Sequence, residues 1–169
     1  MAPSEKILPI PPTNKFYCLQ DRKFNGYKVL NHNKDLAYYV IAKTAATRSH
    51  YRISRSPDGV ALATLDQNQL HYKFSITGEH ENLLATIELV NSDTIKLQVA
   101  KDTYTSPVHI RGKQFEFTNN KGQIVLTIDK KLISLKDQYI VTFVENFPAL
   151  IAPLVAVVID DVYHLGPTN

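Results

Sequence analysis

The chain has 169 residues, of which 44% are hydrophobic and 21% are charged. This length suits one domain and is short for two, and the composition is too apolar for a disordered chain. A net charge of +3 is too small for the dense basic face that nucleic-acid binding requires, which excludes that class of function. The single cysteine, Cys18, excludes an internal disulfide and suits a reducing compartment.

The N-terminal segment is rich in proline, with Pro3, Pro9, Pro11 and Pro12 among its first fifteen residues. Proline cannot donate a hydrogen bond to a β ladder. We therefore expect residues 1–15 to form an extended arm and residues 16–169 to form a single domain. The start of the chain lacks the apolar run of a secretory signal, so we expect a cytoplasmic protein.

From Phe16 onward, short runs of alternating hydrophobic and polar residues predict β-strands. Tyr72, Phe74 and Ile76 alternate with polar residues, and the same period of two recurs at 95–99 and 124–128. Turn residues follow one another about every 8–12 residues, a spacing typical of a sandwich or barrel. One buried and one solvated face per strand favours an antiparallel sheet.

The C-terminal segment breaks this pattern, because the residues from Leu150 to Ile159 would cover every face of a helix with apolar side chains. Pro153 fits if the helix begins near Leu150, and we predict a helix over 150–164. The segment is shorter than the roughly 20 apolar residues that span a membrane, so no transmembrane span is expected. We predict a mainly β fold, a closed antiparallel β-barrel around this buried hydrophobic C-terminal α-helix.

That arrangement resembles the tubby C-terminal-like superfamily, which includes tubby proteins, phospholipid scramblases and the plant LURP-one-related proteins. The run VHIRGKQFEFTNNKGQIVLTIDKKLISLKDQYIVTFVE and the following FPALIAPLVAVVIDDVYH are similar to the strands and central helix of the LURP-one-related pattern. A weaker likeness lies in ISRSPDGVALATLDQ, around Asp58 and Gly59. The resemblance implies the barrel fold, and its tubby members imply binding of phosphoinositides.

Calcium binding of the scramblase kind is not expected. The stretch from Glu145 to Leu150, which stands where scramblases carry acidic ligands, contains one carboxylate. Calcium takes six to eight oxygen ligands, several of them carboxylates. We expect no metal site and no cofactor.

Positive charge is concentrated in the first sixty residues, which hold ten Lys and Arg against four Asp and Glu. Such asymmetry indicates either a face that meets phosphates or an ordinary solvated surface. The densest basic set without an intervening acidic residue consists of Lys43, Arg48, Arg52 and Arg55. The alternation of the strand directs Arg52 to water, and arginine suits bidentate contact with phosphate.

Three groups of residues could carry enzymatic chemistry, although no nucleophile elbow, phosphate loop or zinc-spaced set is present. Asp160 and His164 would share a helix face beside Asp161, His109 and Arg111 would share a strand face, and Cys18 could act as a nucleophile. Each also has a structural interpretation. The acidic pair then marks where the helix reaches water, and Cys18 is a small buried hydrophobe.

The sequence favours a non-enzymatic binding module that meets anionic lipid of the phosphoinositide kind through its basic surface, with peripheral membrane contact. One alternative is a structural or regulatory domain that docks a protein partner, through a barrel edge or the proline-rich arm, and has no lipid role. A second alternative is an enzyme with an Asp/His site at the end of the C-terminal helix.

Overall fold

The computed structural model describes residues 14–21, 23, 25–43, 48–68, 70, 72–108, 114–133 and 136–163. Within them the chain forms twelve strands, one 3-10 turn and one α-helix: β1 (Asn14–Asp21), β2 (Gly26–Leu30), β3 (Leu36–Ala42), β4 (His50–Ser54), β5 (Ala63–Gln67), β6 (Lys73–Thr77), η1 (Glu79–Glu81), β7 (Leu83–Asn91), β8 (Thr94–Val99), β9 (Asp102–Pro107), β10 (Gln114–Thr118), β11 (Ile124–Ile133), β12 (Lys136–Phe143) and α1 (Ile151–Tyr163).

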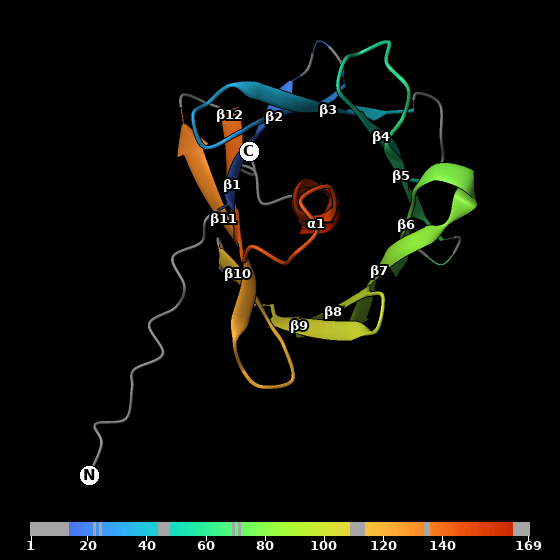
Figure 1. Ribbon diagram of the computed structural model, residues 1–169. Helices are drawn as coiled ribbons and strands as arrows, with labels where there is room; N and C mark the ends of the chain where they lie inside the picture. The colour runs from blue at the N-terminus through green and yellow to red at the C-terminus, as the bar shows by residue number, and fades with distance from the viewer. Residues whose placement is uncertain are drawn as a thin grey trace.

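The strands form a closed barrel in which each pairs antiparallel with its neighbours in the chain, and β1 pairs with β12 to close it. Figure 1 looks down this barrel, with α1 inside the ring of strands. The sheet begins at Asn14, two residues before the predicted domain boundary. Residues 1–13 of the predicted arm lie outside the described residues. The expected mainly β barrel around a C-terminal helix is confirmed.

Close strand packing requires glycine at the start of β2. A Cβ atom at Gly26 would lie 1.9 Å from the carbonyl oxygen of Val40 in β3. Between β9 and β10, the register of the described residues includes the pair Thr105 and Thr118. Inside this region of the wall, the rings of Tyr104 and Phe147 pack with centroids 5.9 Å apart.

Helix α1 fills the barrel because hydrophobic side chains surround it on every side. All residues from Ile151 to Asp160 are buried, and Leu154, Val155 and Val157 are fully inaccessible. The observed helix lies one residue inside the predicted bounds at its start, and His164 lies outside the described residues. Pro153 is the third helical residue, where its missing N–H removes no intrahelical hydrogen bond.

Antiparallel order divides the turns between two rims of the barrel. The helix-end rim, where α1 ends, carries the turns after odd-numbered strands and includes Lys23, Lys43, Arg48, Leu70 and Tyr72. The helix-start rim, where α1 begins, carries the turns after even-numbered strands and includes Lys34, Arg55, Val60, His80 and Lys121. Within the described residues, no helix has the length and apolar character needed to cross a membrane.

The buried helix gives a direct test of this fold. Val155 is 0% exposed and Val158 is 1% exposed, so replacing either with Asp buries a carboxylate without a partner. We expect Val155→Asp and Val158→Asp to abolish cooperative thermal unfolding followed by circular dichroism. Val60→Asp, at a residue 85% exposed, is the control and should melt as the parent does. A folded Val155→Asp variant with unchanged melting would contradict the central position of the helix.

Candidate functional site

The C-terminal end of α1 carries two adjacent carboxylates that bind the barrel wall. Asp160, 9% exposed, accepts a hydrogen bond from the Tyr139 hydroxyl of β12 at 2.5 Å and another from the Tyr27 hydroxyl of β2. Both tyrosines are buried. Because a buried carboxylate is stable only when hydrogen-bonded, these two donors are what allow an acidic residue inside the barrel.

Asp161 makes the second set of contacts. It accepts a hydrogen bond from the Tyr51 hydroxyl of β4 at 3.1 Å and another from the Ser49 hydroxyl. Ser49 directly follows Arg48 on the helix-end rim. The end of the central helix is therefore fastened to the segment that carries one of the predicted anion-binding residues.

Lys130 completes this polar cluster from β11. It is 5% exposed and lies opposite Tyr139 in the β11–β12 register. Its ammonium lies over the Tyr139 ring, 5.9 Å from the centroid. A cation above an aromatic face is attracted by the ring quadrupole, so Lys130 stabilises the same tyrosine that donates to Asp160.

Burial and negative charge hold the tyrosines of the cluster in their neutral form. Burial, followed by the charge of Asp160, raises the pKa of Tyr27 far above its ordinary value. Burial and the charge of Asp161 raise the pKa of Tyr51 in the same direction. Neutral hydroxyls are the donors that both carboxylates need, so the contacts are stable at neutral pH.

The cluster fits an anchor for the helix end. Asp160 and Asp161 bind different strands, and both are satisfied by hydroxyl donors of the wall. Among the described residues, no group of His, Cys, Asp and Glu could hold a metal ion. The acid–base hypothesis needs His164, and the strand-face pair needs His109 and Arg111. These three residues lie outside the described ones, so both hypotheses stay predictions.

Cys18 lies in β1 and is fully buried among core side chains. Burial raises the pKa of its thiol to about 12. Because the thiolate is the nucleophile, a thiol that stays protonated at neutral pH is unreactive. The structural interpretation of Cys18 therefore fits this environment.

The structure distributes the four predicted anion-binding residues over both ends of the barrel. Lys43 and Arg48 are exposed on the helix-end rim, on either side of residues 44–47, which lie outside the described residues. Arg55 is exposed on the helix-start rim. The five residues of β4 between the two rims span about 16 Å, so Arg55 and Arg48 belong to separate surfaces.

Arg52 lies half-buried in the middle of β4 and is engaged with the protein itself. Its guanidinium donates to the carbonyl oxygen of Gly59 at 2.9 Å and to that of Pro57. These contacts hold the turn after β4, where Ser54 also donates to the Ser56 carbonyl at 2.7 Å. Sequence alternation placed Arg52 on the outer face but could not show that its donors are directed at the following turn.

Two exposed hydrophobic residues on the helix-end rim were not predicted as functional. Leu70 is 74% exposed and Tyr72 is 39% exposed, both in the turn between β5 and β6. The alternation with Phe74 and Ile76 placed Tyr72 on the buried face. It is instead exposed because β6 begins one residue later, at Lys73. Asn68 is the residue that could have indicated this turn from the sequence, since asparagine favours turns.

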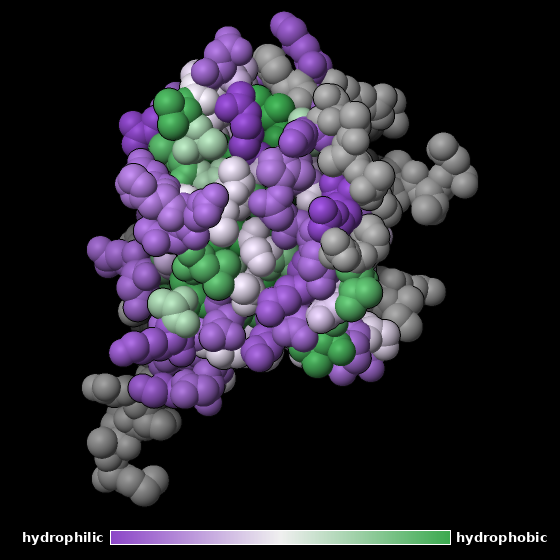
Figure 2. Space-filling view, turned by 90° about the vertical axis from the view of Figure 1, so that its right-hand side faces the viewer, coloured by the Kyte–Doolittle hydropathy of each residue, from purple (hydrophilic) through white to green (hydrophobic). Residues whose placement is uncertain are grey.

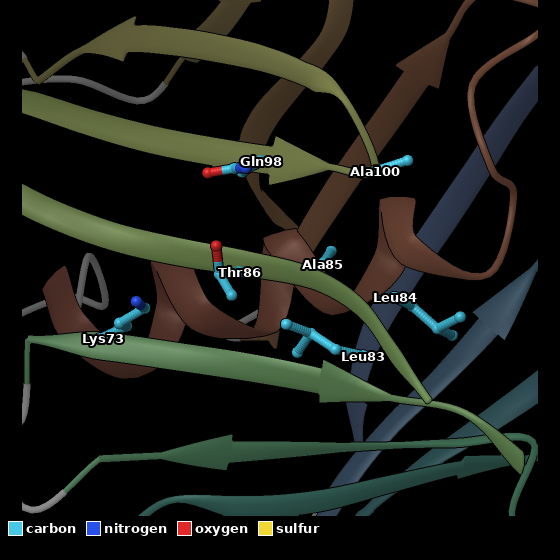
Figure 3. A pocket seen from close by; sticks show the side chains of 7 residues that line it. All are labelled: Lys73, Leu83, Leu84, Ala85, Thr86, Gln98 and Ala100. Carbon is cyan, nitrogen blue, oxygen red and sulfur yellow. The ribbon is translucent and has the colours of Figure 1, made fainter. Parts of the chain in front are cut away.

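A shallow groove of about 260 Å³ crosses the outer wall over β6, β7 and β8. Lys73, Thr86 and Gln98 contribute polar groups to one part of it, and Leu83, Leu84 and Ala100 line the other, as Figure 3 shows. Figure 2 shows the wall around β5, β6 and β7, where hydrophilic residues separate small hydrophobic patches. None of the predicted anion-binding residues lines this groove.

Comparison with known proteins supports the fold alone. No protein-family model matches the chain, and no curated protein matches it. Solved structures do match, among them the X-ray structure of a protein from Arabidopsis thaliana that is 16% identical in sequence. The match covers 90% of this chain and 93% of that chain, with a TM-score of 0.62. At this identity it shows a shared fold and leaves the function to the residues themselves.

The raised tyrosine pKa values predict a loss of stability at alkaline pH. Unfolded tyrosines ionise near pH 10, whereas the pKa of Tyr27 is higher in the folded protein, so the unfolded state releases protons first. The stabilisation is complete below pH 10 and is lost above it, by up to about 1.4 kcal/mol per pH unit for each such tyrosine. We would measure the free energy of unfolding in urea between about pH 9 and pH 11, on either side of the ordinary tyrosine pKa. It should fall less steeply with pH for Tyr27→Phe than for the parent. Equal slopes would contradict the burial of an ionisable hydroxyl at position 27.

The contacts of Arg52 predict a structural role that can be separated from charge. Arg52→Ala removes two hydrogen bonds from a charged donor and should lower the free energy of unfolding by about 1–2 kcal/mol, allowing for partial exposure. For a chain of this size, that corresponds to a fall in Tm of roughly 2–8 °C. Arg55→Ala removes the same charge from an exposed site and should change stability by less than about 0.5 kcal/mol. Equal melting of both variants would show that the turn does not depend on Arg52.

Proposed function

We propose that this protein is a non-enzymatic module that associates peripherally with anionic lipid through its helix-end rim. The observation that carries the proposal is that Lys43 and Arg48 are exposed on the same rim, close to the point where Asp161 fastens α1 to the segment after Arg48. Two of the four predicted residues therefore share a surface. Arg52 holds a turn and Arg55 lies at the opposite end, so neither belongs to the proposed site.

The charges of Lys43 and Arg48 are available to an external anion. Among the described residues, no ion pair joins Lys43 or Arg48 to an acidic side chain. Asp21 forms an ion pair with Lys28 at 3.3 Å, and Asp66 shares a hydrogen bond with the Nδ1 atom of His50. Asp161, which lies next to Arg48 through its bond with Ser49, is engaged with the Ser49 and Tyr51 hydroxyls and forms no ion pair with either cation.

The expected strength follows from the number of cations. Each Lys or Arg held near an anionic membrane surface contributes about 1 kcal/mol, so two contribute about 2 kcal/mol. That energy corresponds to a change in affinity of roughly 30-fold. Attraction of this size is screened by salt and gives reversible contact, as expected of a peripheral protein.

Kinship with the tubby C-terminal-like superfamily is part of the same proposal. A closed barrel around a C-terminal helix is the architecture that the sequence resemblance implies, and the phosphoinositide-binding character of tubby proteins suggests the ligand class. The site proposed for this chain is argued from its own residues, because Lys43 and Arg48 are not aligned with a phosphate site of any relative.

Vesicle flotation tests the proposal. The parent should float with vesicles that contain an anionic lipid at low salt, bind less at moderate salt, and leave neutral vesicles unbound. The double variant Lys43→Ala/Arg48→Ala should bind these vesicles with an affinity at least tenfold lower, and it should melt as the parent does. Lys34→Ala with Arg55→Ala is the matched control, since it removes equal charge from the helix-start rim.

Equal and negligible flotation of the parent in every condition would overturn the lipid proposal and favour a domain that docks a protein. Equal loss of binding in both double variants would show that net charge, and not the helix-end rim, determines the association.

A further inference from the structure

The turn between β5 and β6 projects hydrophobic side chains from the rim that carries Lys43 and Arg48. Leu70 is 74% exposed and Tyr72 is 39% exposed, and Val90 at the end of β7 is 50% exposed. The amide of Leu89 donates to the carbonyl oxygen of Tyr72 at 2.8 Å, so the end of β7 lies beside this turn. These three exposed residues are named the apolar tip.

Asn68 forms hydrogen bonds across this turn to the residues at the start of β6. The side-chain oxygen of Asn68 accepts hydrogen bonds from the amides of Tyr72 and Lys73, each at 3.1 Å. The backbone amide of Asn68 donates to the carbonyl oxygen of Lys73 at 2.8 Å. These three hydrogen bonds join Asn68 to Tyr72 and Lys73 at the far side of the turn.

Direct contacts connect this turn with the basic residues. The amide of Ser49 donates to the side-chain oxygen of Gln67 at 3.1 Å, and the amide of Gln67 donates to the carbonyl oxygen of Ser49 at 2.9 Å. Arg48 precedes Ser49, and Leu70 follows Gln67 by three residues. The cationic and apolar groups therefore belong to neighbouring segments of the helix-end rim.

Together these groups have the chemistry of a surface that enters the interface of a bilayer. Leucine favours the acyl boundary, tyrosine favours the headgroup level with its hydroxyl in water, and cations favour anionic headgroups. A purely electrostatic site would need none of the exposed apolar area. A free phosphate compound would likewise leave Leu70 in water, so the pairing of charge with apolar groups favours a bilayer as the occupant.

We propose that the apolar tip inserts into the interfacial region of an anionic bilayer while Lys43 and Arg48 contact the headgroups. This inference rests on the proposed lipid function and adds the depth and orientation of the bound protein. The helix-start rim also carries exposed hydrophobic residues, among them Val60, Leu83 and Ile124. In the proposed orientation these residues and Arg55 face away from the membrane. Binding has two parts, one sensitive to salt and one supported by burial of apolar surface.

The absence of tryptophan from the chain allows a clean test. Leu70→Trp places a single indole at the apolar tip, and its emission should shift to shorter wavelength when vesicles containing anionic lipid are added. Val60→Trp is the matched control, at an exposed hydrophobic residue on the opposite rim, and its emission should not shift. Leu70→Ser should reduce affinity for the same vesicles about tenfold, as expected when a leucine loses its burial.

The outcomes separate this inference from the proposed function. Flotation of Leu70→Trp with anionic vesicles but without a blue shift would leave lipid binding intact and overturn insertion. Equal shifts of the two tryptophan variants would overturn the orientation. Absence of flotation by the parent would overturn the lipid function itself, and with it the inference. All variants are compared after thermal unfolding confirms that they melt as the parent does.

Discussion

A closed barrel has to fill its interior, and here the filling is a helix of the same chain. The side chains from Ile151 to Ile159 are all buried, and they pack against inward-facing residues of the strands. Because the helix is apolar on every side, it is stable only inside such a wall, and a wall of this circumference needs such a filling. The requirement is mutual, and it directs ligand contact to the rims and the outer wall.

The polar end of the helix shows how this packing is completed. Asp160 binds Tyr27 and Tyr139, and Asp161 binds Tyr51 and Ser49. These hydrogen bonds join α1 to β2, β4 and β12, which belong to different parts of the barrel. The same contacts fix the segment after Arg48, so the position of a proposed lipid-binding residue depends on how the core is closed.

The sequence was sufficient for the features that depend on local pattern. An uninterrupted apolar run predicted the helix to within one residue at each end, and alternation predicted the strands around Phe74, Leu97 and Ile128. It was also sufficient to infer a closed barrel, because an all-apolar helix among strands has few other places to go. These features depend on periodicity, which is visible in any short window of the chain.

Features that depend on long-range contacts were not predictable. Tyr27 lies 133 residues from Asp160 in the chain, and Tyr51 lies 110 residues from Asp161, so no local pattern connects them. The division of Arg48 and Arg55 between rims depends on where β4 begins and ends. Tyr72 was placed in the core because the alternation continues one residue beyond the strand. Which residues belong to the candidate site therefore depends on the exact residues at which β4 and β6 begin and end.

The proposed lipid contact lies on the helix-end rim of a barrel whose interior is filled by α1. Hydrogen–deuterium exchange of the unaltered protein, free and bound to anionic vesicles, tests it most directly. We expect the amides of Arg48, Leu70 and Tyr72 to exchange more slowly when vesicles are bound, whereas those of Arg55 and Val60 should be unchanged. Protection confined to Arg55 and Val60, or to the groove residues Thr86 and Gln98, would contradict it.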